Sequence, residues 1–123
     1  MVLQLNDNEI DAVLKKVNFE KMKGLVPVII QDANDNKVLM QAFMNEEALQ
    51  LTLTSGKTHF WSRTRNRIWL KGETSGHHSL VKNIFLDCDN DAILFKVHQL
   101  GPICHTGQET CFHNQIVVKR TEN

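Results

Sequence analysis

Three cysteines in the C-terminal third are the residues of this chain best suited to chemistry. Cys88 stands inside the acidic run DCDND, and Cys104 and Cys111 follow later in the sequence. Thiolates bind zinc, and a site built from only three of them leaves the fourth position open for water, as in catalytic zinc centres. Carboxylates prefer a harder ion such as magnesium. The segment therefore predicts a metal-dependent enzyme.

The spacing of the cysteines alone is a weak zinc signal. The three residues lie much farther apart than the cysteine pairs of zinc ribbons and fingers, and incidental or buried thiols remain an alternative. Two local features favour the interpretation of the cysteines as metal ligands. Cys104 and His105 follow a Gly-Pro break that can aim side chains, and His113 places a nitrogen donor close to Cys111.

The aspartates of the acidic run alternate with other residues. In an extended segment Asp87, Asp89 and Asp91 would share one face and Cys88 would point to the other, so that each set could serve its own metal. The zinc site would then be completed from another region or another chain. A solvated acidic turn remains open as an alternative. An EF-hand is excluded because its glycine and glutamate positions hold other residues.

A basic segment with aromatics and glycines lies between residues 59 and 78. Arginine side chains match phosphate oxygens, and a glycine-rich turn offers backbone N–H donors. Trp61 and Trp69 could stack on a base, although a strand tryptophan is more often core. We expect a small phosphorylated nucleotide here, and His77 and His78 are interpreted as an exposed polar pair. The predicted substrate-binding residues are Trp61, Ser62, Arg63, Arg65, Lys71, Gly72, Glu73, Thr74, Ser75 and Gly76.

Bulk composition narrows the functional class. The chain has 123 residues, the size of one domain spanning 1–123, and its 14 Lys+Arg balance its 14 Asp+Glu. Zero net charge argues against nucleic acid and acidic membranes as partners. Three cysteines cannot all pair within one chain, which favours a reducing compartment. With no leader pattern and no long apolar stretch, we expect a cytoplasmic protein without a membrane span.

The elements that must position these residues follow from periodicity, capping and turn signals. Short strands joined by tight turns favour an α+β fold, with two helices and a mainly antiparallel sheet or roll. Residues 25–31 and 38–43 are expected to form a hairpin around a polar turn. The predicted helices are 8–17 and 46–54, and the predicted strands are 25–31, 38–43, 58–62, 68–71, 80–86, 92–99 and 116–119.

Several of these motifs, in this order, resemble the phosphoribosyl-AMP cyclohydrolase family of histidine biosynthesis. The resemblance runs from about residue 24 to about residue 112. The motifs that carry it are GLVPVIIQD (24–32), FWSR (60–63), KGETSG (71–76), DCDND (87–91), CHTG (104–107) and CF (111–112).

The resemblance implies a zinc- and magnesium-dependent homodimer that hydrolyses the N1–C6 bond of the adenine ring. It assigns Cys88, Cys104 and Cys111 as zinc ligands, with the zinc site shared between two chains. It assigns magnesium to the three aspartates of the acidic run, Asp87, Asp89 and Asp91. His105, beside a ligand, is the candidate proton carrier because imidazole exchanges protons near neutral pH, or else it is a group that supports or transiently joins the zinc ligands.

Departures from the family pattern are small. Thr110 keeps a hydroxyl where serine is common, and His77 stands where asparagine is expected, which puts an amide contact to substrate in doubt. Some family members carry a second, pyrophosphohydrolase domain. Because the sequence stops at Asn123, that activity is expected to be absent.

Two other functions compete with this assignment. A zinc-dependent base deaminase also attacks a ring carbon, but its Pro-Cys-x-x-Cys signature is missing after Pro102. A non-catalytic zinc module that binds nucleic acid would show salt-sensitive binding and no turnover. Zero net charge and the three carboxylates argue against the second.

Overall fold

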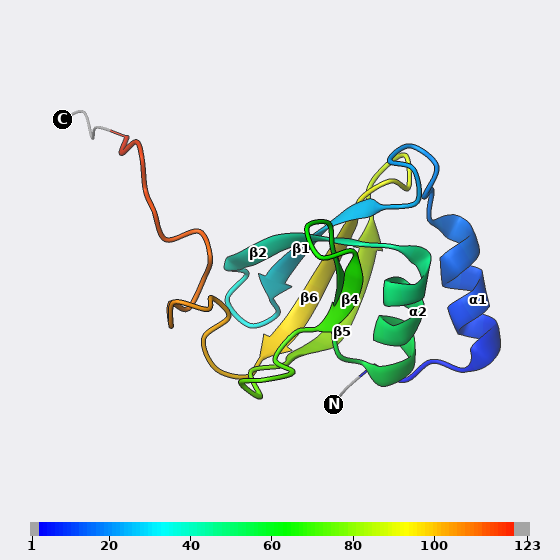
Figure 1. Ribbon diagram of the computed structural model, residues 1–123, viewed down its shortest axis with the longest axis horizontal. Coiled ribbons are helices and arrows are strands. Elements are labelled where there is room, and N and C mark those ends of the chain that lie inside the picture. Colours follow the sequence, from blue (N-terminus) through cyan, green and yellow to red (C-terminus); the bar gives the residue numbers. More distant parts are fainter. Residues whose placement is uncertain (1–2, 120–123) are drawn as a thin grey trace.

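The structure, a computed structural model, describes residues 3–119 and has an α+β fold (Figure 1). Its helices are α1 (Asp7–Lys16) and α2 (Glu46–Ser55). Its strands are β1 (Val26–Asp32), β2 (Val38–Met44), β3 (His59–Ser62), β4 (Arg67–Leu70), β5 (Ser79–Leu86) and β6 (Ile93–Gln99). Each of these agrees with a predicted element to within one or two residues.

The helix bounds are set by local capping. The Asn6 side chain accepts a hydrogen bond from the Glu9 amide at 2.8 Å, and the Glu9 carboxylate accepts from the Asn6 amide at 3.0 Å, a capping box. The Asn45 side chain caps α2 by accepting from the Ala48 amide at 2.8 Å. Gly56 ends α2 in the left-handed conformation, with φ of 76°.

The strands form a four-stranded sheet in the order β2-β1-β6-β5 and a separate β3-β4 hairpin. The predicted β1–β2 hairpin is confirmed, and β5 also pairs antiparallel with β6. The β1–β6 pair is parallel, from Val28 opposite Ile93 to Asp32 opposite Val97. This pairing joins segments far apart in the sequence and departs from the expectation of successive antiparallel neighbours.

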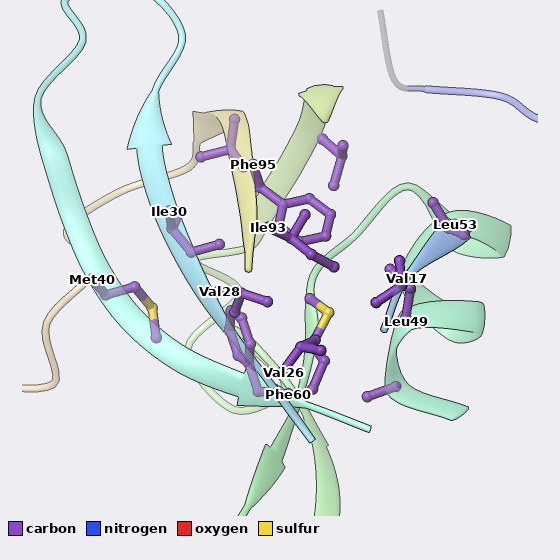
Figure 2. Packing of buried hydrophobic residues seen from close by; sticks show 14 of the residues in the cluster. Val17, Val26, Val28, Ile30, Met40, Leu49, Leu53, Phe60, Ile93 and Phe95 are labelled. Atoms are coloured by element: carbon purple, nitrogen blue, oxygen red, sulfur yellow. The ribbon is translucent and has the colours of Figure 1, made fainter. Parts of the chain in front are cut away.

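One face of the sheet carries the hydrophobic core. Alternate residues of β1 (Val26, Val28, Ile30) and β6 (Ile93, Phe95, Val97) are buried. They belong to one core cluster with Leu49 and Leu53 of α2, and Figure 2 shows Val28, Ile93 and Phe95 on the side of the sheet that faces this helix. Both helices lie on this side of the sheet (Figure 1). The opposite face, which includes Ile29 and Leu94, is only half-buried.

The C-terminal segment differs from the prediction. Residues 112–119, called the C-terminal arm below, lead away from the body of the molecule (Figure 1). The predicted strand 116–119 is wrong, because β-branched composition alone does not supply the hydrogen-bonding neighbour that a strand needs. Within residues 3–119, neither helix has the length and hydropathy required to cross a membrane.

Two leucines of α2 test the core. Leu49 is fully buried, whereas Leu51 is 38% exposed. We expect Leu49→Ala to lower the free energy of unfolding by about 2–5 kcal/mol, because it removes buried methyl groups and leaves a cavity. Leu51→Ala, which makes the same change in helix propensity, should cost less than about 1 kcal/mol. Denaturant unfolding measures both, and equal losses would contradict the packing described here.

Candidate functional site

One cavity collects most of the predicted substrate-binding residues. It has a volume of about 520 Å³ and lies between the end of β4, the glycine-rich turn that follows it and the loop after β6. Both the basic segment and the CHTG motif therefore face the same space. The cavity is lined by Arg65, Trp69, Leu70, Lys71, Gly72, Glu73, Thr74, Ser75, His77, Pro102, Ile103, Cys104, His105 and Gly107.

The glycine-rich turn depends on a glycine at position 72. Gly72 has φ of +84°, and its carbonyl accepts a hydrogen bond from the Gly76 amide at 2.7 Å. A Cβ on Gly72 would lie 2.6 Å from the backbone carbon of His77. Only glycine fits there without moving the turn.

His77 and His78 are not the exposed pair that was predicted; both are half-buried and support the cavity wall. The Nδ1 of His78 hydrogen bonds with the Lys71 carbonyl at 2.8 Å. The His77 carbonyl accepts from the Gln99 side chain at 3.1 Å, and the His77 ring lies against Gly101. The two histidines thus tie the glycine-rich turn to the end of β6. The prediction failed because the loop after β6 folds back over them.

The remaining predicted binding residues lie around a neighbouring cavity or outside both cavities. The neighbouring cavity has a volume of about 340 Å³ and is lined by Ser62, Arg65, Arg67, Trp69 and Glu73, so the two cavities share three residues. Arg63 instead lies over the Phe43 ring, 4.0 Å from its centroid. Trp61 and Gly76 line neither of these two cavities.

Lys71 extends from the cavity toward two of the cysteines. Its half-buried ammonium donates a hydrogen bond to the Ile103 carbonyl. Burial lowers the pKa of Lys71, while the negative charges of Cys111 and Cys104 raise it in part. The lysine is thus held beside a pair of thiols.

Cys104 and Cys111 form a thiol pair suited to metal binding. The Thr106 hydroxyl donates to the Cys104 Sγ at 3.1 Å and, with the Thr106 amide, lowers the pKa of Cys104 to about 6. The His113 Nε2 lies 3.9 Å from the same sulfur. Burial and the charge of Cys104 raise the pKa of Cys111. These contacts favour the thiolate form of Cys104, which is the form that binds zinc.

The third cysteine lies at the opposite end of β6. Cys88 precedes this strand in the β5–β6 turn, whereas Cys104 follows it (Figure 1). A strand of 7 residues is about 20 Å long. One chain therefore offers Cys88 as a single exposed thiol and the Cys104–Cys111 pair separately. These residue types fit zinc, but a single chain does not bring all three together.

The three aspartates do come together. Within residues 3–119 their ligand atoms form the only group of at least three metal-ligating side chains that lie within 4.8 Å of one another. They stand on a turn, one of the two arrangements that the sequence left open, and not on an extended segment. The Asp87 carboxylate accepts the amides of Asp91 at 3.0 Å and Ala92 at 3.2 Å, which folds the run on itself. The cluster fits a hard divalent cation.

Lys21 neutralises part of this acidic cluster and was missed by the sequence reasoning. Its Nζ lies 2.7 Å from Asp89 and 2.9 Å from Asp91. The hydrogen bond from Lys21 lowers the pKa of Asp89 to about 2. The same bond lowers the pKa of Asp91, but the other two carboxylates outweigh it and the net shift is upward. Lys21 lies nearly 70 residues earlier, so no local signal pointed to it.

The other lining residues were predicted only in part. His105, the predicted proton carrier, is exposed and lines the larger cavity beside Cys104. Trp69 lines both cavities and packs on Phe60 with ring centroids 5.1 Å apart. The sequence had left open whether Trp69 stacks on a base or belongs to the core. Pro102, Ile103 and Gly107 reach the cavity only because the loop after β6 folds over the glycine-rich turn.

Comparisons with a family model and with known proteins all lead to one enzyme family. The phosphoribosyl-AMP cyclohydrolase family model matches residues 40–113. A phosphoribosyl-AMP cyclohydrolase of Clostridium botulinum is 49% identical over 108 residues, covering 88% of this chain and 98% of that protein. One of Streptococcus mutans is 52% identical over 100 residues, 81% of this chain and 92% of that protein. A histidine biosynthesis bifunctional protein of Caldanaerobacter subterraneus is 54% identical over 81% of this chain and 48% of its own length.

Two glycines of the turn provide a matched test of the cavity wall. Gly72 and Gly76 both have positive φ, but only at Gly72 would a Cβ meet other backbone atoms. We expect Gly76→Ala to cost about 1–2 kcal/mol from its φ alone. Gly72→Ala should cost at least about 1 kcal/mol more, because the turn must also move. Thermal unfolding compares them, and equal costs would show that the turn is not packed as described.

Proposed function

Because the chain belongs to the phosphoribosyl-AMP cyclohydrolase family, we propose that it hydrolyses the N1–C6 bond of the adenine ring of phosphoribosyl-AMP, in histidine biosynthesis. The observation that supports this most strongly is the larger cavity. There, a cationic and glycine-rich wall faces Cys104 and His105. A phosphate-binding surface and a candidate hydrolytic centre thus share one space.

The cavity supplies groups for both parts of such a substrate. Arg65 and the amides and hydroxyls of Thr74 and Ser75 suit phosphate oxygens. The Trp69 face suits an adenine ring. The phosphates are remote from the bond that breaks, so their binding energy is available to orient the ring.

Zinc would be held by Cys104 and Cys111 of one protomer and by the partner's Cys88. When bound there, zinc supplies the Lewis acidity that makes water a competent nucleophile at neutral pH. Lys71 lies beside the thiol pair, where its charge offsets theirs. The depressed pKa of Cys104 keeps one ligand ionised before any metal arrives.

Magnesium would be held by Asp87, Asp89 and Asp91, whose ligand atoms already lie close together. To bind there it must compete with the Lys21 ammonium, which makes two short ion pairs with the cluster. A divalent ion carries twice the charge of the lysine and relieves the carboxylate repulsion more fully. An ion held by these carboxylates would supply positive charge suited to the phosphate oxygens of the substrate.

His105 is proposed to move the proton that the reaction requires. Hydrolysis adds a water oxygen to C6, breaks the N1–C6 bond and leaves a proton on N1. His105 is exposed on the cavity wall next to Cys104, and imidazole exchanges protons near neutral pH.

We propose that the protein acts as a homodimer, because one chain holds only parts of the site. The aspartate turn and Cys88 stand at one end of β6, while the cavity and the Cys104–Cys111 pair stand at the other. A two-fold dimer that places these ends against each other would create two complete sites.

Turnover tests the function directly. The wild-type protein should open the ring of phosphoribosyl-AMP, followed by its ultraviolet spectrum, and a zinc chelator should abolish the activity until zinc is returned. His105→Ala should lower kcat by about 100-fold or more, because it removes the proton carrier. His98→Ala is the control, since His98 is exposed on β6 and outside the cavity. No turnover by the metal-loaded wild type would contradict the proposal.

Mixing inactive variants tests the shared site. Cys88→Ala and Cys104→Ala should each be inactive alone. Reassociated in equal amounts, they should recover about a quarter of wild-type activity, because half of the dimers are mixed and one of their two sites is intact. Mixing Cys104→Ala with Cys111→Ala restores no intact site and is the control. A lack of recovery in the first mixture would contradict a zinc site shared between the two chains.

A further inference from the structure

The C-terminal arm exposes an unusual amount of apolar surface. Phe112 is 63% exposed, and Ile116, Val117 and Val118 are 93%, 78% and 70% exposed. In Figure 1 the arm runs away from the body of the molecule. Several large apolar side chains so close in sequence and so exposed mark a segment that gains stability when another surface covers it.

A groove on the open face of the sheet offers such a surface. Ile29, Leu94 and Phe85 are register partners across β1, β6 and β5, so they form one apolar row. The groove along this row has a volume of about 360 Å³ and is also lined by Leu86, Asp87, Ala92 and Ile93. Phe85 is 51% exposed. The helices lie against the other face, so within residues 3–119 no helix of the same chain covers the groove.

The groove and the arm each adjoin one half of the proposed zinc site. The groove wall includes Asp87, the residue immediately before Cys88. The arm begins immediately after Cys111, whose amide donates to the Leu39 carbonyl at 2.8 Å and so anchors the arm's root on β2. If the partner's Cys111 meets Cys88, the partner's arm starts beside the groove. The five residue-to-residue steps from Cys111 to Ile116 can extend about 17 Å, enough to lie along the row.

We propose that each C-terminal arm lies in the apolar groove of a second copy of this chain, with Ile116, Val117 and Val118 packed against Phe85 and Leu94. This inference rests on the proposed function, since the shared zinc site sets the relative position of the two chains. By two-fold symmetry the arms exchange reciprocally, and each fastens one zinc half-site to the other. The arm's own groove is a poorer receptor, because it begins at the far end of β6 from the arm's root.

A double-mutant cycle on the dimer dissociation constant tests the exchange. One variant of the full chain carries Ile116→Asp and Val118→Asp, a second carries Phe85→Asp, and a third combines all three changes. All of these side chains are exposed in the single chain, so the fold should persist, which circular dichroism checks. Leu51→Asp, on the helix side, is the control. Analytical ultracentrifugation, with wild type in parallel, gives each constant.

The first two variants should each raise the dissociation constant about tenfold or more, because a charge replaces a covered apolar side chain. The dissociation constant of the combined variant should not exceed the larger of the two single values. Once the arm no longer binds, a change in the groove has nothing further to disrupt. The exchange would be overturned if the dissociation constants were unchanged or if the wild type were monomeric. It would also be overturned if the fold-changes of the two variants multiplied in the combined variant. The proposed function fails on a separate observation, the absence of wild-type turnover.

Discussion

The length of β6 is the constraint on which the rest of this structure depends. Because β6 is hydrogen bonded to β1 on one side and to β5 on the other, it cannot bend to bring its ends together. One end carries the aspartate turn and Cys88, and the other leads to the cavity, Cys104 and His105. The thiols that resemble a zinc site are therefore divided by about 20 Å of rigid strand. A second copy is the simplest source of the missing part.

Each half of the proposed site contains a lysine that offsets its negative charge. Lys21 pairs with Asp89 and Asp91, and Lys71 lies beside the Cys104–Cys111 pair. Clustered anions without a cation repel one another, which would disfavour both loops in the absence of metal. The two lysines thus explain how a single chain holds metal-ligating groups close together before a metal or a partner is present.

The sequence predicted the elements whose signals are local. Asn45 and Gly56 mark the ends of α2 because caps act on the adjacent turn. The parallel β1–β6 pairing and the Lys21 ion pairs were missed, since both join residues that are distant in the sequence. The sequence predicted Lys71 and Gly72 as substrate-binding residues, and both line the cavity. His77 and Ile103 line it too, but only because tertiary folding brings them there. The expected strand at 116–119 failed because a strand needs a hydrogen-bonding neighbour, and none pairs with this segment within residues 3–119.

The central claim is that the three sulfurs gather across two chains. Crystals of the zinc-loaded dimer, with diffraction data collected on both sides of the zinc absorption edge, would locate the ion without assumptions about its ligands. The account predicts an anomalous peak between Cys88 of one protomer and the Cys104–Cys111 pair of the other. A peak bound within one chain by Cys104, Cys111 and His113, with Cys88 remote from any zinc, would contradict it.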